Sequence, residues 1–243
     1  MTITQIKAEF RQEKNAQHAS AISRFFKTGK GQYGEGDQFL GIKVPVIRKY
    51  AKKYKATQIS VLSQLVTSQF HEERLLALII LVMQYQQAVK EADTATRNAI
   101  YKTYLKAHPS INNWDLVDVT TEHIMGAQLF GTDCKVLYTW AKSKILWKRR
   151  MAIMATFHFI RRGDFYHTLK IAEILLHDEH DLIHKAVGWL LREIGKREQK
   201  VEESFLKKHA HVMPRTMLRY AIEKFPEKKR RAYLQRRSSS TTR

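Results

Sequence analysis

Only four prolines interrupt this sequence of 243 residues, and each lies where an apolar helical pattern begins or has just ended. They are Pro45, Pro109, Pro214 and Pro226. The ten glycines bring the number of strong helix breakers to only 14, too few for the many turns of a β-sandwich or barrel. The chain is therefore expected to be all-α, with long and little-interrupted helices.

Helical repeats are indicated by four similar segments: HEERLLALIILV, LWKRRMAIMATF, LIHKAVGWLLRE and RTMLRYAIEKF. The step from Arg74 to Arg150 is 76 residues, or twice 38, and the step from Arg150 to Lys185 is 35, spacings typical of HEAT-like repeats. The pattern predicts a HEAT-like solenoid of about six helix pairs with one concave wall. Helical apolar spacing covers residues 4–26, 45–54, 58–67, 70–86, 93–107, 113–126, 133–142, 146–162, 165–177, 180–196, 200–210 and 214–225.

One segment breaks the helical pattern. Five of the ten glycines lie between Gly29 and Gly41, together with Tyr33 and Phe39. This composition predicts a small β-hairpin inserted near residues 29–41. Two uses of the hairpin remain open: a DNA-contacting element, or a structural flap whose aromatic side chains pack on the first helices.

The charge of the chain points to a polyanionic partner. Its formal net charge is +20 and its pI is about 10.0. A single cysteine, Cys134, excludes an intramolecular disulfide, and no segment has the length and apolarity of a membrane span or the pattern of a signal peptide. We expect a soluble cytoplasmic protein with one domain over residues 1–228 and a basic, Ser/Thr-rich flexible tail over 229–243.

The predicted helix at 180–196 has a basic face. Lys185, Trp189, Arg192 and Lys196 follow one another at steps of four, three and four residues, so they share one side of the helix. An indole among cations fits a partner with phosphates and sugars or bases. The alternative is that Trp189 packs as core against a neighbouring helix.

Two further helices carry candidate site residues. Asp118 lies one turn after Trp114, on the same face of the helix. Beside DNA its carboxylate would repel phosphates, so we expect it to stabilise a cation that is formed or bound at the site. The alternative is a salt bridge with an Arg of a neighbouring repeat. Asp115 lies in the first helical turn, where the helix dipole stabilises a negative charge, so its presence there needs no functional explanation. Arg150 lies one turn after Trp147 and is predicted to face the groove along the concave wall, where its guanidinium would bind DNA phosphates.

A metal site is not expected. His177, His180 and His184 have a spacing that occurs in metal sites, but no HExxH pattern accompanies them, and the chain has eleven histidines. The sequence indicates no cofactor.

Four segments together resemble the AlkD-like family of DNA alkylation repair proteins, which are HEAT-like-repeat alkylpurine DNA glycosylases. They are FLGIKVPVIRK at 39–49, NNWDLVD at 112–118, LWKRRMAI at 146–153 and KAVGWLLRE at 185–193. The similarity extends over roughly residues 20–225.

The resemblance implies roles for individual residues. Asp118 would be the catalytic carboxylate, with Trp114 and Trp189 flanking the sugar and base of the damaged nucleotide. Phe25 stands where the family usually has a pocket Tyr, and His158 where it has a Lys. Arg150 and Arg192 would hold backbone phosphates. With the basic face at 180–196, the full set of expected DNA-binding residues is Arg150, Arg192, Lys185, Lys196, Lys43, Arg48 and Phe25.

The expected function is release of cationic N3- or N7-alkylated purines from double-stranded DNA by a monomeric protein in the bacterial cytoplasm, associated with the nucleoid when bound. A carboxylate would stabilise an oxocarbenium-like transition state. Two alternatives remain: a non-catalytic protein that binds branched or damaged DNA, and a HEAT scaffold for other proteins.

Overall fold

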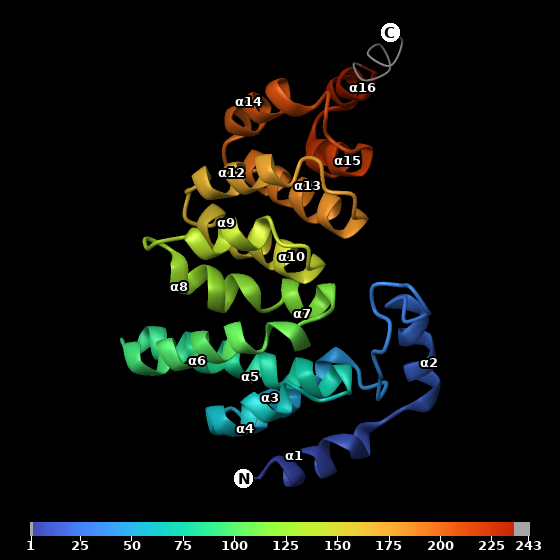
Figure 1. Cartoon of the computed structure of the whole chain (residues 1–243), viewed down its shortest axis with the longest axis vertical. Helices are drawn as coiled ribbons and strands as arrows, with labels where there is room; N and C mark the ends of the chain where they lie inside the picture. The colour runs from blue at the N-terminus through green and yellow to red at the C-terminus, as the bar shows by residue number, and fades with distance from the viewer. Residues whose placement is uncertain (1, 236–243) are drawn as a thin grey trace. The chain divides into compact units, whose positions relative to one another are not determined.

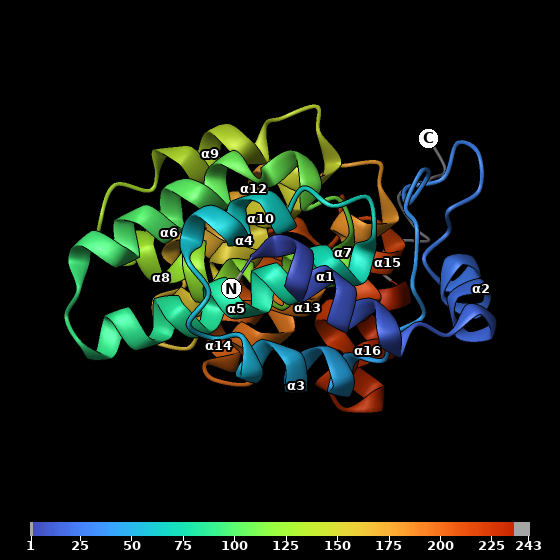
Figure 2. The same ribbon diagram turned by 90° about the horizontal axis from the view of Figure 1, so that it is seen from below.

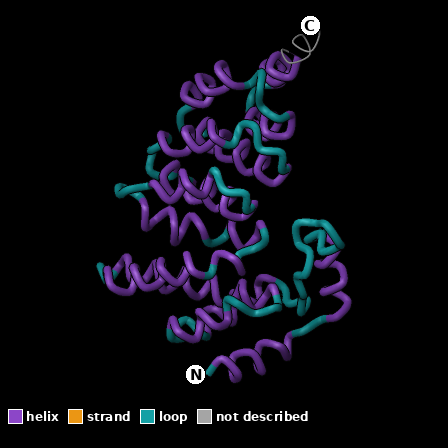
Figure 3. The backbone as a smooth tube through the Cα atoms, viewed as in Figure 1, coloured by secondary structure: helices purple, strands orange, loops and turns teal. Residues whose placement is uncertain are grey.

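The computed structural model describes residues 2–235 and divides into two compact units, Met1–Gln128 and Leu129–Arg243. Helices dominate both units (Figure 3), and the described part of the chain contains no β-strand beyond one isolated bridge between Gln38 and Phe70. The predicted all-α class is confirmed. Within residues 2–235, no helix has the length and apolar character needed to cross a membrane.

Helix α5, His71–Lys90, forms the core of the first unit (Figure 1). It packs against α3, Val44–Lys53, against α4, Ile59–Leu65, and against α6, Thr94–Lys106. Its residues from 71 to 82 are buried on every side, which explains why the part from Leu75 to Val82 is apolar all round rather than amphipathic. The other helices of the unit are α1 (Ile3–Phe10), η1 (Arg11–Glu13), α2 (Ala16–Phe25), η2 (His108–Ser110), α7 (Trp114–Asp118) and the π-helix η3 (Glu122–Gly126); α8 (Ala127–Leu129) follows at the boundary.

Helix α13, Asp181–Gly195, has the same central place in the second unit. It packs most extensively against α15, Arg215–Ala221, and a Cβ atom on Gly188 would lie only 2.4 Å from the carbonyl oxygen of Met217. Glycine at 188 therefore permits the close approach of these two helices. The other helices are α9 (Lys135–Ala141), α10 (Leu146–Ala155), α11 (Phe157–Ile160), α12 (Tyr166–Ile174), α14 (Gln199–His209), η4 (Ile222–Lys224) and α16 (Glu227–Gln235).

Two predicted boundaries differ from the structure. The helix expected over 4–26 is interrupted at residues 11–15, where Asn15 begins a new helix by accepting a hydrogen bond from the backbone N–H of His18 at 2.8 Å. Residues 229–235 of the expected tail belong to α16, and residues 236–243 lie outside the described part. The single domain over 1–228 and the HEAT-like solenoid stay predictions.

The predicted β-hairpin near residues 29–41 is wrong. Gly31 and Gly36 have φ angles of 73° and 86°, so they turn the chain twice within a short distance. The backbone hydrogen bonds are local, such as Asp37 N–H to the Gly34 carbonyl at 3.1 Å, rather than a ladder between two strands. Figure 2 shows this segment as the loop beside α2, at the edge of the first unit.

Candidate functional site

Aromatic side chains gather at the C-terminal end of α2 in the first unit. The ring of Phe26 stacks on Phe39 at 5.3 Å and on the indole of Trp114 at 5.2 Å between centroids. Phe25 meets Trp114 edge to face at 5.9 Å and is 66% exposed. Trp114 is thus held by two phenylalanines while remaining partly exposed. Phe39 is a packing residue, as the flap alternative predicted.

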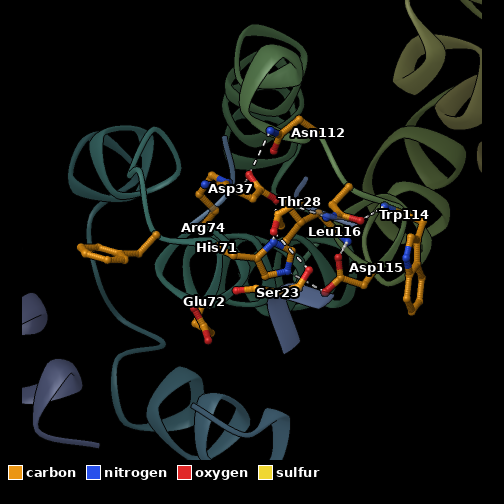
Figure 4. A network of polar contacts seen from close by, with 12 residues as sticks. Ser23, Thr28, Asp37, His71, Glu72, Arg74, Asn112, Trp114, Asp115 and Leu116 are labelled. Atoms are coloured by element: carbon orange, nitrogen blue, oxygen red, sulfur yellow. Dashed lines mark hydrogen bonds and ion pairs between the residues drawn. The ribbon is translucent and has the colours of Figure 1, made fainter. Parts of the chain in front are cut away.

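A buried histidine lies beside this aromatic cluster (Figure 4). His71, the first residue of α5, is only 2% exposed; its Nδ1 lies 3.3 Å from Asp37 and its Nε2 lies 2.7 Å from Asp115. Burial alone would lower the pKa of His71, but the hydrogen bonds to Asp115 and Asp37 outweigh it and raise the pKa to about 9. The imidazole is therefore a cation at neutral pH and donates from both ring nitrogens.

Asp37, from the Gly-rich segment, collects further donors. Arg74 Nη2 donates to it at 2.6 Å, and the side-chain amides of Asn112 and Asn113 donate at 3.2 Å each. Burial would raise the pKa of Asp37, but the hydrogen bond from His71 and the charge of Arg74 keep it below its usual value. An ionised Asp37 thus ties the Gly-rich segment to α5 and to the residues that precede α7.

The start of α5 carries four polar residues whose partners have no local signature in the sequence. The Glu72 carboxylate accepts the backbone N–H groups of Leu40, Gly41 and Ile42 at 2.9, 2.7 and 3.2 Å. The Glu73 carboxylate receives Arg11 Nε at 2.6 Å. The available signal was a run of four polar residues, HEER, that opens a strongly apolar helix.

Asp118 is the last residue of α7 and is half-buried. The phenol of Tyr104 is buried and lies 2.8 Å from each of the hydroxyls of Thr120 and Thr121. Burial, and to a smaller degree the charge of Asp118, raise the pKa of Tyr104. The π-helix η3 begins shortly after Asp118, and π-helical turns are frequent at functional sites.

In the second unit, α13 presents the predicted basic face. Lys185, Trp189 and Arg192 are partly exposed and Lys196 is exposed. Trp189 packs edge to face on Phe157 at 5.5 Å between centroids, so it is neither fully core nor fully free. The cations have acidic partners: Asp181 for Lys185 at 2.6 Å, Glu223 for Arg192, and Glu193 for Lys196 at 2.5 Å.

The expectation that Arg150 faces an open groove is corrected by the structure. Arg150 is 5% exposed, and its Nη1 donates to the Leu182 carbonyl at the start of α13. Its guanidinium therefore helps to hold α10 against α13. Lys43 and Arg48, which were also expected to contact DNA, are exposed at the N-cap and in the middle of α3.

The histidines at 177, 180 and 184 do not form a metal site. His180 Nδ1 accepts the backbone N–H of Leu182 at 3.1 Å, and His184 Nε2 contacts the backbone oxygen of Asp178. Among residues 2–235, no group of three His, Cys, Asp or Glu side chains is arranged to hold a metal ion.

Comparison with known proteins agrees with this fold. The family described as DNA alkylation repair enzyme matches residues 6–225, and the chain belongs to this family. A solved structure described as a predicted DNA alkylation repair enzyme from Enterococcus faecalis is similar in fold, with a TM-score of 0.66 and 18% sequence identity over 88% of this chain and 98% of the other. No protein of curated function matches the sequence.

Proposed function

We propose that this protein is a DNA glycosylase that releases cationic N3- or N7-alkylated purines from duplex DNA. The observation that carries the proposal is α7, a short helix that presents an aromatic ring, Trp114, and a carboxylate, Asp118, within one turn of each other. Membership of the DNA alkylation repair family and the net charge of +20 support DNA as the substrate.

The chemistry suits a site with few groups. An alkylated purine that carries a positive charge leaves as a neutral base, so its departure needs no general acid. The sugar develops oxocarbenium character, which an ionised Asp118 stabilises, and the same carboxylate positions the attacking water. The electron-rich face of Trp114 attracts the cationic nucleotide.

The cationic residues are proposed to bind the DNA backbone. In the second unit, Arg192, Lys185 and Lys196 bind phosphates and Trp189 contacts the sugar or base. Each of these cations now pairs with a carboxylate, so a phosphate would exchange with that carboxylate instead of binding an unpaired cation. In the first unit, Lys43 and Arg48 supply further phosphate contacts and Phe25 an apolar contact. Arg150 contributes indirectly, through its hydrogen bond to the Leu182 carbonyl at the N-terminal end of α13.

The test is base release. Purified protein is incubated with methylated duplex DNA, and free 7-methylguanine and 3-methyladenine are quantified, with unmethylated duplex as the control. Release of either base that depends on the protein and on methylation is expected.

A non-catalytic DNA-binding protein is the second candidate. The resemblance to the AlkD-like family implies a Tyr where this chain has Phe25, and implies that the Gly-rich loop at 29–41 is an insertion. Tight binding of branched duplex without any base release would favour that candidate and contradict the glycosylase.

A further inference from the structure

Helix α7 is too short to fix its own orientation. It has five residues, Trp114–Asp118, and a helix of this length gains little stability from its own hydrogen bonds. Yet it carries both residues that the proposed chemistry needs. The direction in which Trp114 and Asp118 point must therefore come from contacts outside the helix.

Leu116 and Val117 pack the buried side of α7, and the polar contacts that hold its first turn come from one ionic cluster, which we call the α7 clamp: Asp37, His71 and Asp115. Asp115, in the first turn of α7, binds His71 at 2.7 Å, and His71 in turn reaches Asp37 at 3.3 Å. The two residues before α7, Asn112 and Asn113, donate to Asp37 as well. Three of the four residues 112–115 are thus bound by the clamp, and the fourth is Trp114. Figure 4 shows Asn112 and Asp115 beside Asp37 and His71.

The clamp also contacts the aromatic cluster, through the ring of His71. The His71 ring lies parallel to Phe39, with 4.8 Å between centroids and 26° between planes, and lies 5.1 Å from Phe26. Phe26 is the ring on which Trp114 stacks. A charged imidazole under this stack adds cation–π attraction to the packing. His71 therefore contacts both Asp115 in the first turn of α7 and Phe26, the ring on which the Trp114 indole stacks.

We propose that the α7 clamp is a positioning device: the charged His71 side chain, held between Asp37 and Asp115, orients α7 so that Trp114 and Asp118 are preorganised for the nucleotide. The catalytic use of this orientation rests on the proposed glycosylase function. The contacts that hold α7 do not depend on that function. Residues of the clamp are positioning residues and do not touch the substrate.

The clamp should open at alkaline pH. The charged groups that face His71 are Asp37, Asp115 and Arg74; the two carboxylates favour the imidazolium, and the guanidinium opposes it. With a pKa of about 9, His71 keeps its charge at neutral pH and loses it as the pH rises through 9. Loss of the proton removes one of its two N–H donors, so either Asp37 or Asp115 is released.

One structural readout does not depend on catalysis. The indole N–H signal of Trp114, assigned by its loss in Trp114→Phe, is followed by NMR between pH 7 and pH 10. In the wild-type protein the signal should shift with an apparent pKa near 9. In His71→Gln this titration should disappear, and in the exposed control His211→Gln it should remain. A wild-type signal that does not move over this range overturns the proposal.

The second readout separates positioning from binding. We expect His71→Gln and Asp115→Asn to slow single-turnover base release by roughly 10-fold or more, because a small misplacement of reacting groups is costly. Duplex affinity should change by less than about threefold, since neither side chain binds DNA. Wild-type rates in both variants, or equal losses of rate and affinity, overturn the proposal.

The two hypotheses fail in different ways. If wild-type protein releases no base, the proposed function is wrong, and the Trp114 titration alone decides on the clamp. If His71→Gln does not fold, Asp115→Asn replaces it, because an asparagine still accepts the Leu116 N–H that Asp115 Oδ1 now accepts at 2.8 Å. His71 still titrates in this variant, so the Trp114 signal should then shift at a lower pH than in the wild type, because the Asp115 charge that favours the imidazolium is gone. A Trp114 titration at the wild-type pH in Asp115→Asn overturns the proposal.

Discussion

A single carboxyl group in the second unit illustrates how burial controls charge. Glu202 on α14 is 1% exposed, and its Oε1 has no hydrogen-bond partner within the described residues. Burial and the neighbouring charge of Glu203 raise the pKa of Glu202 to about 8, against the opposing effects of Lys229 and Arg192. The folded protein therefore holds this proton over a pH range in which the unfolded chain has lost it.

Glu202→Gln is expected to stabilise the protein at alkaline pH. Because the pKa of Glu202 is higher in the folded state, the stability linked to this group is complete below about pH 4.5 and is lost as the pH rises through about 8. The variant has no such loss, so its free energy of unfolding should exceed that of the wild type by on the order of 5 kcal/mol at pH 9.

Thermal and urea unfolding at pH 5 and pH 9 measure this difference. The exposed Glu179→Gln serves as the control and should unfold like the wild type at both pH values. A stability difference for Glu202→Gln that is the same at pH 5 and pH 9 would show that Glu202 does not hold a proton in the folded state.

At the scale of elements, the contact between α13 and α15 depends on one missing side chain. A Cβ atom on Gly188 would lie 2.4 Å from the Met217 carbonyl oxygen and 2.6 Å from the Tyr220 Cβ. Both atoms belong to, or are fixed to, the backbone of α15, so neither can move aside without moving the helix. Gly188 therefore sets the distance between the two helices.

Gly188→Ala should destabilise the second unit. The gain in helix propensity, about 1 kcal/mol, is outweighed by the overlap, and we expect a net loss of roughly 1–3 kcal/mol. Urea unfolding measures the loss. Lys200→Ala, at an exposed position of α14, should change stability by less than about 0.5 kcal/mol. A Gly188→Ala variant as stable as the wild type would mean that α15 packs less closely than described.

Helices were predictable from the sequence because their signals are local. Apolar periodicity, prolines and caps predicted α3, α5, α13 and most others to within a few residues, whereas the break before α2 depends on a single capping residue, Asn15. The Gly-rich segment was predicted to be the wrong kind of turn because glycine permits many turn geometries.

The site was predictable only in part, since its long-range contacts have no local signature. His71 meets Asp37 and Asp115 across 34 and 44 residues, and Arg150 finds its acceptor, Leu182, 32 residues away on another helix. That Trp114 and Asp118 lie one turn apart on the same helix was predictable because their relation is local, and their roles in the site stay predictions.

At the scale of the whole molecule, the net charge of +20 predicts how the protein meets DNA. Counterions released from the duplex make affinity fall linearly with salt on a log–log plot. Arg192→Ala should reduce that slope by about one phosphate contact, whereas Lys135→Ala, a control on α9 whose side chain is 90% exposed, should leave it unchanged.

The slope is measured by fluorescence anisotropy with an undamaged duplex from roughly 50 to 200 mM salt. Equal slopes for Arg192→Ala and the wild type would place the backbone contacts elsewhere than on α13.

The most direct test of the proposed function is single-turnover base release by Asp118→Asn. The substitution keeps the shape of the side chain and removes the charge that stabilises the oxocarbenium-like sugar, so release of 7-methylguanine or 3-methyladenine should fall by a factor of about 100 or more. Duplex affinity should be equal or slightly higher, because one negative charge near the phosphates is gone. Glu91→Gln, which removes a charge at the far end of α5 from His71, should release base like the wild type. Release by Asp118→Asn at the wild-type rate would contradict the role of Asp118.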